Sequence, residues 1–120
     1  MANPSVIVSG SGTEVLRRSH IHDLSNTSYT LIDGVADHIY TVLSVTIQNR
    51  ETSTVVDVGL YITTDTGTDI KLLDYLSLPG QGTFVFNDKI VLAGADELKA
   101  IVFQANNTDW YCSYIDQDFT

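Results

Sequence analysis

Two histidines separated by one residue, His20 and His22, are the first candidates for chemistry in this chain of 120 residues. On an extended strand both imidazoles point to the same face, which is how some metal sites in β proteins begin. His38 could supply a third ligand if the fold brought it close. No histidine follows His38, and no glutamate stands at the spacing of a cupin-type site. We therefore expect surface or inter-subunit histidines, with no metal ion and no cofactor.

The triplet Asp65-Thr66-Gly67 matches the one that carries the catalytic aspartate of aspartic proteases. In a dimer, two such loops would share one proton, because like charges at close range cannot both ionise. The flanking residues depart from that pattern, since Thr63 and Thr64 precede the triplet where an apolar run is expected. Asp65 and Asp69 could also begin a calcium loop, but the glutamate of an EF-hand is missing. We predict a polar turn in which Gly67 takes a positive φ.

The single cysteine, Cys112, lies in an aromatic run that also contains Trp110, Tyr111 and Tyr114. No basic residue stands beside it to lower the pKa of its thiol, so we predict a buried thiol that behaves as a small hydrophobe. The aromatic side chains could form a carbohydrate-binding platform. Alternating aromatic residues on a terminal strand more often fill a core or an interface, and this is the interpretation that we favour.

The scaffold for these residues is indicated by the side chains from residue 39 to residue 115, where apolar residues recur with a period of two. Such alternation is typical of half-buried antiparallel strands. The clearest strands are Ile39–Asn49 and Thr54–Thr63, which we predict to pair with each other. In the first of them one face is expected to carry Ile39, Thr41, Leu43, Val45 and Ile47.

Turn residues divide the rest of the chain into short strands. We predict a type II turn at Pro79-Gly80, with glycine at the second corner, and a final hairpin between Glu97–Ala105 and Trp110–Ile115. The chain is thus predicted to be all-β, an antiparallel β-sandwich of jelly-roll or immunoglobulin-like type. We expect the two sheets to bury Val45, Ile47, Val56, Val58, Leu60, Ile62 and Phe86 between them.

Residues 1–27 are the least regular part, and we predict an irregular N-terminal arm or edge segment there, followed by a sandwich domain over residues 28–120. The apolar run Val6-Ile7-Val8 and the run Thr13–Arg18 could each be an edge strand, or could lie on a neighbouring subunit. As protein-interface residues we predict Val6, Ile7, Val8, Arg17, Arg18, Trp110 and Tyr111.

Charge and hydropathy exclude two classes of partner. The formal net charge is −9, from 15 acidic residues against six lysines and arginines, so the surface would repel the phosphates of a nucleic acid. No stretch approaches the ~18–20 apolar residues of a membrane-spanning helix. The first residues also lack the basic and apolar regions of a signal peptide, so we expect assembly in a cytoplasm.

Four segments carry a resemblance to a known family: Ser44–Asn49, Leu78–Gly82, Asp88–Ala100 and Ser113–Ile115. Together they resemble the small β-sandwich virion proteins of tailed bacteriophages, including phages of cyanobacteria and marine bacteria. The resemblance covers roughly residues 28–116. The chain departs from it at Ala95, which separates Gly94 from Asp96, and in its N-terminal extension.

This resemblance implies a non-enzymatic structural protein of the virion, assembled in the host cytoplasm and present in many copies. Its partners would be capsid, connector or tail proteins, in a role as capsid decoration or as a neck or tail accessory. Two alternatives stay open at this point. One is a carbohydrate- or receptor-binding module of a phage fibre, and the other is a dimeric aspartic protease that uses Asp65.

Overall fold

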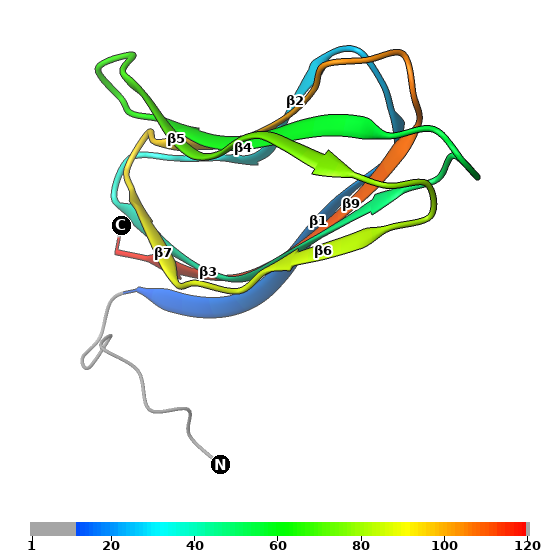
Figure 1. Cartoon of the computed structure of the whole chain (residues 1–120). Coiled ribbons are helices and arrows are strands. Elements are labelled where there is room, and N and C mark those ends of the chain that lie inside the picture. Colours follow the sequence, from blue (N-terminus) through cyan, green and yellow to red (C-terminus); the bar gives the residue numbers. More distant parts are fainter. Residues whose placement is uncertain (1–11, 120) are drawn as a thin grey trace.

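Alternating apolar and polar side chains produce an all-β structure in the computed structural model, which describes residues 12–119 (Figure 1). Nine strands lie within these residues, and none of the described residues forms a helix that could span a membrane. The strands are β1 Thr13–Leu24, β2 Ser28–Asp33, β3 His38–Asn49, β4 Val56–Thr63, β5 Asp69–Leu78, β6 Thr83–Phe86, β7 Ile90–Ala93, β8 Glu97–Val102 and β9 Thr108–Asp118.

The strands form two antiparallel sheets that follow the order of a jelly roll. The first sheet runs β1-β9-β3-β6, with β7 also paired to β3, and the second runs β2-β8-β4-β5. The pairs β1–β9, β2–β8, β3–β6/β7 and β4–β5 are nested, as in one long antiparallel ribbon whose tip is the turn between β4 and β5. Rolling that ribbon into two facing layers produces the jelly roll. The predicted antiparallel sandwich is confirmed, and of the two types considered the strand order is that of the jelly roll.

The core lies between the two sheets, where the inward faces of β3 and β4 meet. All six aliphatic residues predicted there are buried, and the ring of Phe86 packs against them from the rim of the sandwich. Other large buried side chains include Leu92, Leu98, Val102 and Trp110. Side chains from opposite sheets therefore interlock, as in other two-layer β proteins.

Two predicted strand pairs are wrong. β3 and β4 do not pair, because β3 belongs to the first sheet and β4 to the second, and the two strands face each other across the core. Likewise β8 and β9 do not form a hairpin, since the chain crosses from one sheet to the other between them. In both cases a polar loop between two alternating strands has the same appearance in the sequence whether it turns within a sheet or crosses between sheets.

A β-bulge at Leu43 changes which side of β3 faces the core. Val42 pairs with Tyr114 and Ser44 with Ser113, so Leu43 is the extra residue. Before the bulge Tyr40 and Val42 are buried, and after it Val45 and Ile47 are buried. One extra residue reverses the alternation, so the predicted inward face is right only in the second half of the strand.

The turn after β5 is displaced by one residue from its predicted form. The amide of Gly82 donates a 2.8 Å hydrogen bond to the carbonyl of Pro79, so Gly80 and Gln81 occupy the two corners. Gln81, with φ of 62°, takes the left-handed position. Gly80 is needed for another reason: a Cβ atom there would lie 2.6 Å from the backbone carbonyl of Thr52.

Residues 13–24 form the edge strand β1, which pairs along its length with β9. Of the two possibilities left open for the run at Thr13–Arg18, the structure contains the edge strand. The division of the chain into an arm of residues 1–27 and a domain of residues 28–120 stays a prediction.

Candidate interaction surface

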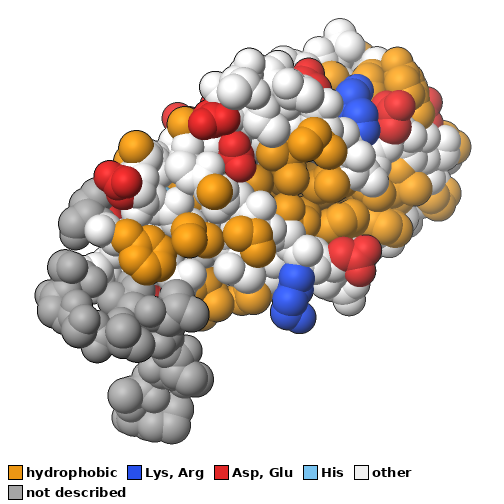
Figure 2. All heavy atoms as spheres, turned by 90° about the vertical axis from the view of Figure 1, so that its left-hand side faces the viewer, with side chains coloured by type: hydrophobic (Ala, Val, Ile, Leu, Met, Phe, Trp, Pro, Cys, Tyr) orange, Lys and Arg blue, Asp and Glu red, His pale blue; other side chains and the backbone are white. Residues whose placement is uncertain are grey.

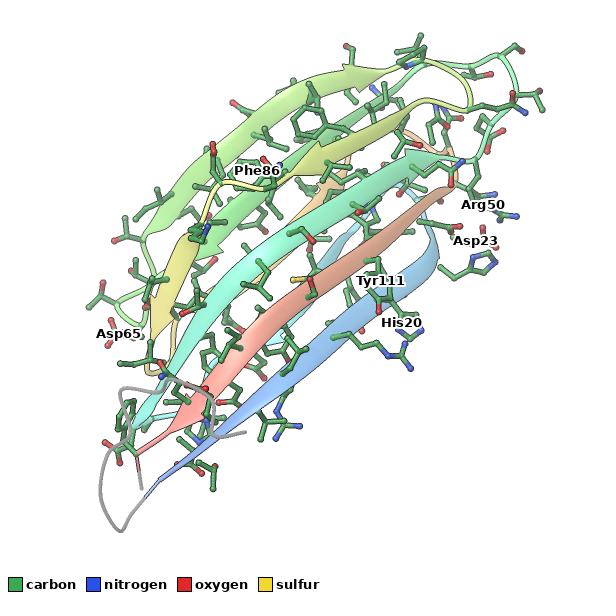
Figure 3. All side chains as sticks on the ribbon, turned by 90° about the horizontal axis from the view of Figure 1, so that it is seen from below. His20, Asp23, Arg50, Asp65, Phe86 and Tyr111 are labelled. Atoms are coloured by element: carbon green, nitrogen blue, oxygen red, sulfur yellow. The ribbon has the colours of Figure 1, made fainter. Side chains whose placement is uncertain are left out.

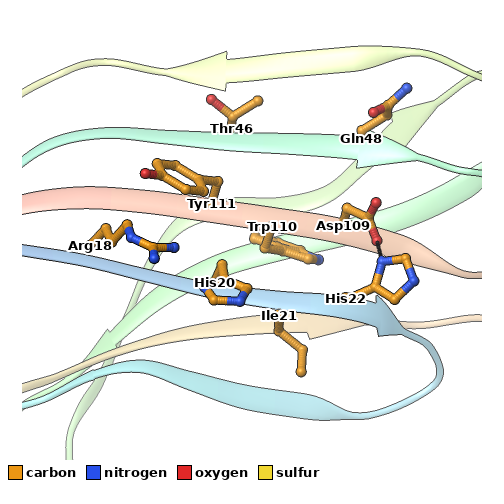
Figure 4. Close-up of a pocket in the computed structure, with 9 residues that line it drawn as sticks. All are labelled: Arg18, His20, Ile21, His22, Thr46, Gln48, Asp109, Trp110 and Tyr111. Carbon is orange, nitrogen blue, oxygen red and sulfur yellow. Dashed lines mark ion pairs between the residues drawn. The ribbon is translucent and has the colours of Figure 1, made fainter.

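The outward face of the β1-β9-β3 layer carries two neighbouring hollows. The first has a volume of about 310 Å³ (Figure 4) and the second about 390 Å³, and Arg18 and Tyr111 line both of them. We refer to the two hollows together as the groove. Its other lining residues include Leu16, His20, Leu43, Thr46 and Ser113.

Strand pairing explains why these residues meet. His20 lies opposite Tyr111, and Arg18 lies opposite Ser113, so the four side chains share the outward face of two adjacent strands. Thr46 lies opposite Tyr111 on the other side of β9. Figure 3 shows His20 and Tyr111 on these two strands. Residues about ninety positions apart in the sequence thus form one surface.

The groove combines apolar and basic side chains, with the carboxylate of Asp109 at one end. Leu16 is 70% exposed and Tyr111 is 46% exposed, which is high for large hydrophobic residues. An exposed apolar area bordered by polar residues is typical of interaction sites. Leu16 and Leu43 were absent from the predicted interface residues. The outward alternation of Leu16 with Arg18 and His20 was a usable signal, whereas Leu43 enters the groove through the bulge.

The two adjacent arginines that were predicted as contact residues have different roles. The Nε of Arg17 donates a 2.9 Å hydrogen bond to a carboxylate oxygen of Asp116, and Arg17 also borders the second hollow. Arg18 has no ion-pair partner among the described residues. Arg18 is therefore the cation in the groove that is available to a partner.

The predicted interface residues Trp110 and Tyr111 point in opposite directions. Trp110 is 2% exposed, and its indole lies in the core, so it offers no stacking platform for a sugar at the surface. Tyr111 faces outward into the groove. The remaining predicted interface residues, Val6, Ile7 and Val8, lie outside the described residues.

His22 is part of a charged cluster at the end of the groove. Its Nδ1 lies 2.8 Å from Asp109 and its Nε2 lies 3.1 Å from Asp23, and donor atoms of these three residues lie within 4.8 Å of one another. Three such ligands could approach one metal ion. Arg50 forms ion pairs with both carboxylates, and its guanidinium group already provides the compensating cation. The cluster has the composition of a surface ion-pair network.

His38 lies far from the other two histidines. Its partner on β9 is Asp118, whereas the partner of His20 is Tyr111, and seven residues along a strand correspond to roughly 24 Å. The Nδ1 of His38 lies 2.7 Å from Asp116, and its ring stacks on Tyr40. The histidines therefore do not form the three-ligand site that the sequence had left open.

Asp65 stands in the exposed turn at the tip of the β4–β5 hairpin. Thr64 closes this turn by accepting a 2.8 Å hydrogen bond from the amide of Gly67, whose φ is 90°, as predicted. The backbone amide of Asp65 donates to a carboxylate oxygen of Asp96. This is the geometry of a solvated hairpin turn.

Cys112 is fully buried on the inward face of β9. Burial disfavours the thiolate and raises the pKa of this thiol to about 12. The predicted buried thiol is confirmed. Burial also raises the pKa of Tyr40 and of Tyr114, whose rings pack edge to face nearby.

Comparison with known proteins finds similar folds but identifies no family for this chain. Neither a scan against protein-family models nor a search of curated proteins finds a match. Among solved structures, the chain is similar to a subunit of Bacillus endospore appendages, which are disulfide-linked pili, with a TM-score of 0.54 and 16% identity over 99% of this chain and 100% of that one. At such identity the similarity concerns the fold.

Two viral structures are similar to a comparable degree. One is a chain from the acid-stable capsid of a Helicobacter pylori bacteriophage, with a TM-score of 0.52 and 12% identity over 88% of this chain and 92% of that one. The other comes from infectious bursal disease virus, with a TM-score of 0.50 and 11% identity over 99% of this chain and 37% of that one. This chain therefore spans about a third of the second viral protein.

Proposed function

We propose that the protein is a non-enzymatic structural subunit of a virus particle that binds other virion proteins in many copies. The main support is the jelly-roll topology of a chain that matches the fold of a pilus subunit over 99% of its length and that of a phage capsid subunit over 88%. A rigid sandwich of this kind can repeat on a symmetric lattice, where many modest contacts add up to strong attachment.

The more specific proposal is a role in a tailed bacteriophage. The sequence resemblance supports a capsid decoration protein or a neck or tail accessory protein, with capsid, connector or tail proteins as partners. The location would be the virion, after assembly in the host cytoplasm. The negative charge of −9 favours contacts with proteins over direct contacts with the packaged nucleic acid.

Open sheet edges supply one means of attachment. Among residues 12–119, β1 and β2 each pair on one side only, and so do β5 and the β6/β7 edge. An extended segment from a neighbouring subunit can add to such an edge through backbone hydrogen bonds. We propose that residues 1–27, with the apolar run Val6-Ile7-Val8, act in this way between neighbouring subunits.

A second uncovered area lies on the side of the molecule that carries β5 and β7. Figure 2 shows a continuous group of hydrophobic side chains there, with acidic side chains around it. Ile70 and Tyr75 on β5 and Val91 on β7 are among the exposed large hydrophobic residues. Contacts on more than one side of the sandwich are what a subunit within a lattice requires.

The proposed function is tested by quantitative mass spectrometry of gradient-purified phage particles from the host that carries this gene. We expect the chain to be present at a fixed ratio to the major capsid protein through successive purification steps. A soluble host protein of similar abundance in the lysate serves as the control and should disappear. Loss of this chain together with that control would contradict a role in the virion.

A glycan- or receptor-binding module is the second candidate, and one observation favours it: Tyr111 stands exposed beside Arg18 and His20 in the groove. A glycan array with the full chain tests this function. Binding that Tyr111→Ala abolishes would support it. An array without signal would remove it and leave the structural role unaffected.

A further inference from the structure

We propose that the groove on one copy of this chain receives the loop of residues 33–37 from a second copy. The inference rests on the proposed function, because it supplies a contact through which a subunit could repeat. It commits to a second copy as the occupant because the loop and the groove are complementary in both charge and apolar character.

The loop joins β2 to β3 and is held rigidly by its backbone. The amide of Gly34 donates a 3.0 Å hydrogen bond to the carbonyl of Asp96, and the amide of Val35 donates to the hydroxyl oxygen of Tyr40 at 3.1 Å. The carbonyl of Asp37 accepts from the amide of Phe119 at 2.9 Å. A surface that is already fixed loses little conformational entropy on binding.

This rigid loop presents two exposed apolar side chains, Val35 and the small Ala36, between two carboxylates. Val35 is 53% exposed, and Asp33 and Asp37 on either side of it are exposed as well. Neither carboxylate has a cationic partner among residues 12–119. Gly34 cannot be replaced without disturbing this arrangement, because a Cβ atom there would lie 2.2 Å from two backbone carbonyl oxygens.

The surroundings of the loop strengthen its negative potential. Asp33 lies opposite Glu97 in the sheet, and the backbone of Asp96 contacts Gly34. Asp65 adds a further carboxylate, since its amide binds the side chain of Asp96. This end of the sandwich is therefore strongly acidic, and a basic surface would be attracted to it.

The groove has the opposite character. Arg18 has no partner in its own chain among the described residues, and Arg17 and His20 stand near it. Leu16 and Tyr111 expose apolar surface beside Arg18. Val35 would fit against Leu16 and Tyr111 while a carboxylate of Asp33 or Asp37 pairs with Arg18, whose charge the described part of its own chain leaves unpaired.

The contact would be heterologous, because the loop and the groove are different surfaces of the same molecule. Each copy then offers one loop and one groove, and successive copies form a closed ring or an extended chain. A two-fold symmetric dimer would leave no unused loop or groove for a further copy. The two arrangements therefore differ in the mass that the unmodified chain reaches, because only the two-fold arrangement stops at a dimer.

The experiment measures the mass of the full chain in solution by sedimentation velocity and light scattering over a range of concentrations. We expect the unmodified chain to self-associate, and Arg18→Glu and Val35→Asp each to lower the association constant at least about tenfold. Circular dichroism and thermal unfolding confirm that each variant is folded. Lys71→Glu and Val55→Asp are matched controls: Lys71 is an exposed lysine on β5, in the sheet that does not carry the groove, and Val55 is as exposed as Val35.

Mixing the two disrupted variants gives the decisive result. Arg18→Glu retains a good loop and Val35→Asp retains a good groove, so the mixture can form one contact and should yield a 1:1 heterodimer and nothing larger. A mixture that remains monomeric, or single variants that associate like the unmodified chain, would overturn the proposal. So would an unmodified chain that is monomeric throughout.

These outcomes are separate from those of the particle analysis. A chain that is present in virions at a fixed ratio but monomeric in solution would remove the loop-in-groove contact alone. A chain that forms the heterodimer but is absent from particles would remove the virion role alone.

Discussion

The indole N–H of Trp110 donates a 2.8 Å hydrogen bond to the hydroxyl oxygen of Thr108, two residues earlier on β9. The same hydroxyl donates at 2.8 Å to the backbone carbonyl of Leu24, at the end of β1. Both side chains are buried. One hydroxyl group thus satisfies two buried polar groups and links the last residue of β1 to the neighbouring strand.

Thr108→Val should destabilise the protein, because it leaves the indole N–H and the Leu24 carbonyl without partners. We expect the free energy of unfolding in urea to fall by about 2–3 kcal/mol. Thr108→Ser keeps the hydroxyl and serves as the control, with an expected loss of at most about 1 kcal/mol for one methyl group. Equal losses in the two variants would show that the hydroxyl group is not what matters.

Asn49 should tolerate substitution least of the polar residues. Its buried amide nitrogen donates to the carbonyl oxygens of Thr54, Leu78 and Pro79, at 2.7 to 3.1 Å. Asn49→Asp would set a carboxylate against three carbonyl oxygens, and we expect a loss of about 3 kcal/mol or more at neutral pH.

The effect of Asn49→Asp should also depend on pH. The carbonyl oxygens and burial would raise the pKa of the new carboxyl in the folded state, so the penalty grows as the pH rises above its unfolded pKa. Urea unfolding at about pH 4 and pH 7 measures the difference. Gln48→Glu, on the exposed side of the same strand, is the control and should change little. A penalty for Asn49→Asp that is the same at both pH values would contradict this account.

Cys112 should be unreactive in the folded protein. The pKa of its thiol is about 12 because of burial, so almost no thiolate exists near pH 8, and the sulfur is also inaccessible. We expect a chromogenic disulfide reagent to modify the thiol only after denaturant is added. Cys112→Ala combined with Ser113→Cys places a thiol on the outward face and should react in the folded state.

The raised pKa of Cys112 also has a consequence for stability. The folded state holds the thiol proton more tightly than the unfolded state does. This difference therefore makes its full contribution to the free energy of unfolding below pH 9.0, the ordinary pKa of a cysteine thiol. It is lost as the pH rises from there toward about 12. Rapid labelling of the native thiol at pH 8 would contradict both the burial and the shifted pKa.

Asp57 should contribute to stability only where it is ionised. Hydrogen bonds from Ser77 at 2.6 Å and then from Gln104 at 2.8 Å hold the pKa of its carboxyl below the usual 3.8. A lowered pKa stabilises the folded state above the unfolded value, and this contribution disappears as the pH falls through the folded value. Ser77→Ala should therefore reduce the free energy of unfolding at about pH 6, and the difference should vanish at about pH 2. Ser53→Ala, on an exposed loop, is the control.

The alternation of the sequence between residues 39 and 115 was sufficient to predict most strands there, the class of fold and the aliphatic core, but it did not predict the full length of β1. Val56, Val58, Leu60 and Ile62 alternate without interruption, and all four are buried. The turn at Gly67 was also predictable, because a local chemical preference determines it. These features depend on neighbours in the sequence.

The strand partners and the groove could not be predicted in the same way. Whether β8 turns back on itself or crosses to the other sheet depends on contacts with β2 and β4, which lie far away in the sequence. The bulge at Leu43 has no signature of its own, yet it reverses the alternation of β3. Arg18 and Tyr111 become neighbours only through the register of β1 with β9.

The position of β9 between β1 and β3 determines when this protein can fold. During synthesis on a ribosome, β1 and β3 emerge early, but each lacks the central strand that joins them. β3 can pair with β6 and β7, and β4 with β5, before then, but the backbone groups of β1 and of one edge of β3 stay unpaired until β9 has left the exit tunnel. This delay is the interval in which nascent chains are most vulnerable to aggregation and to proteases.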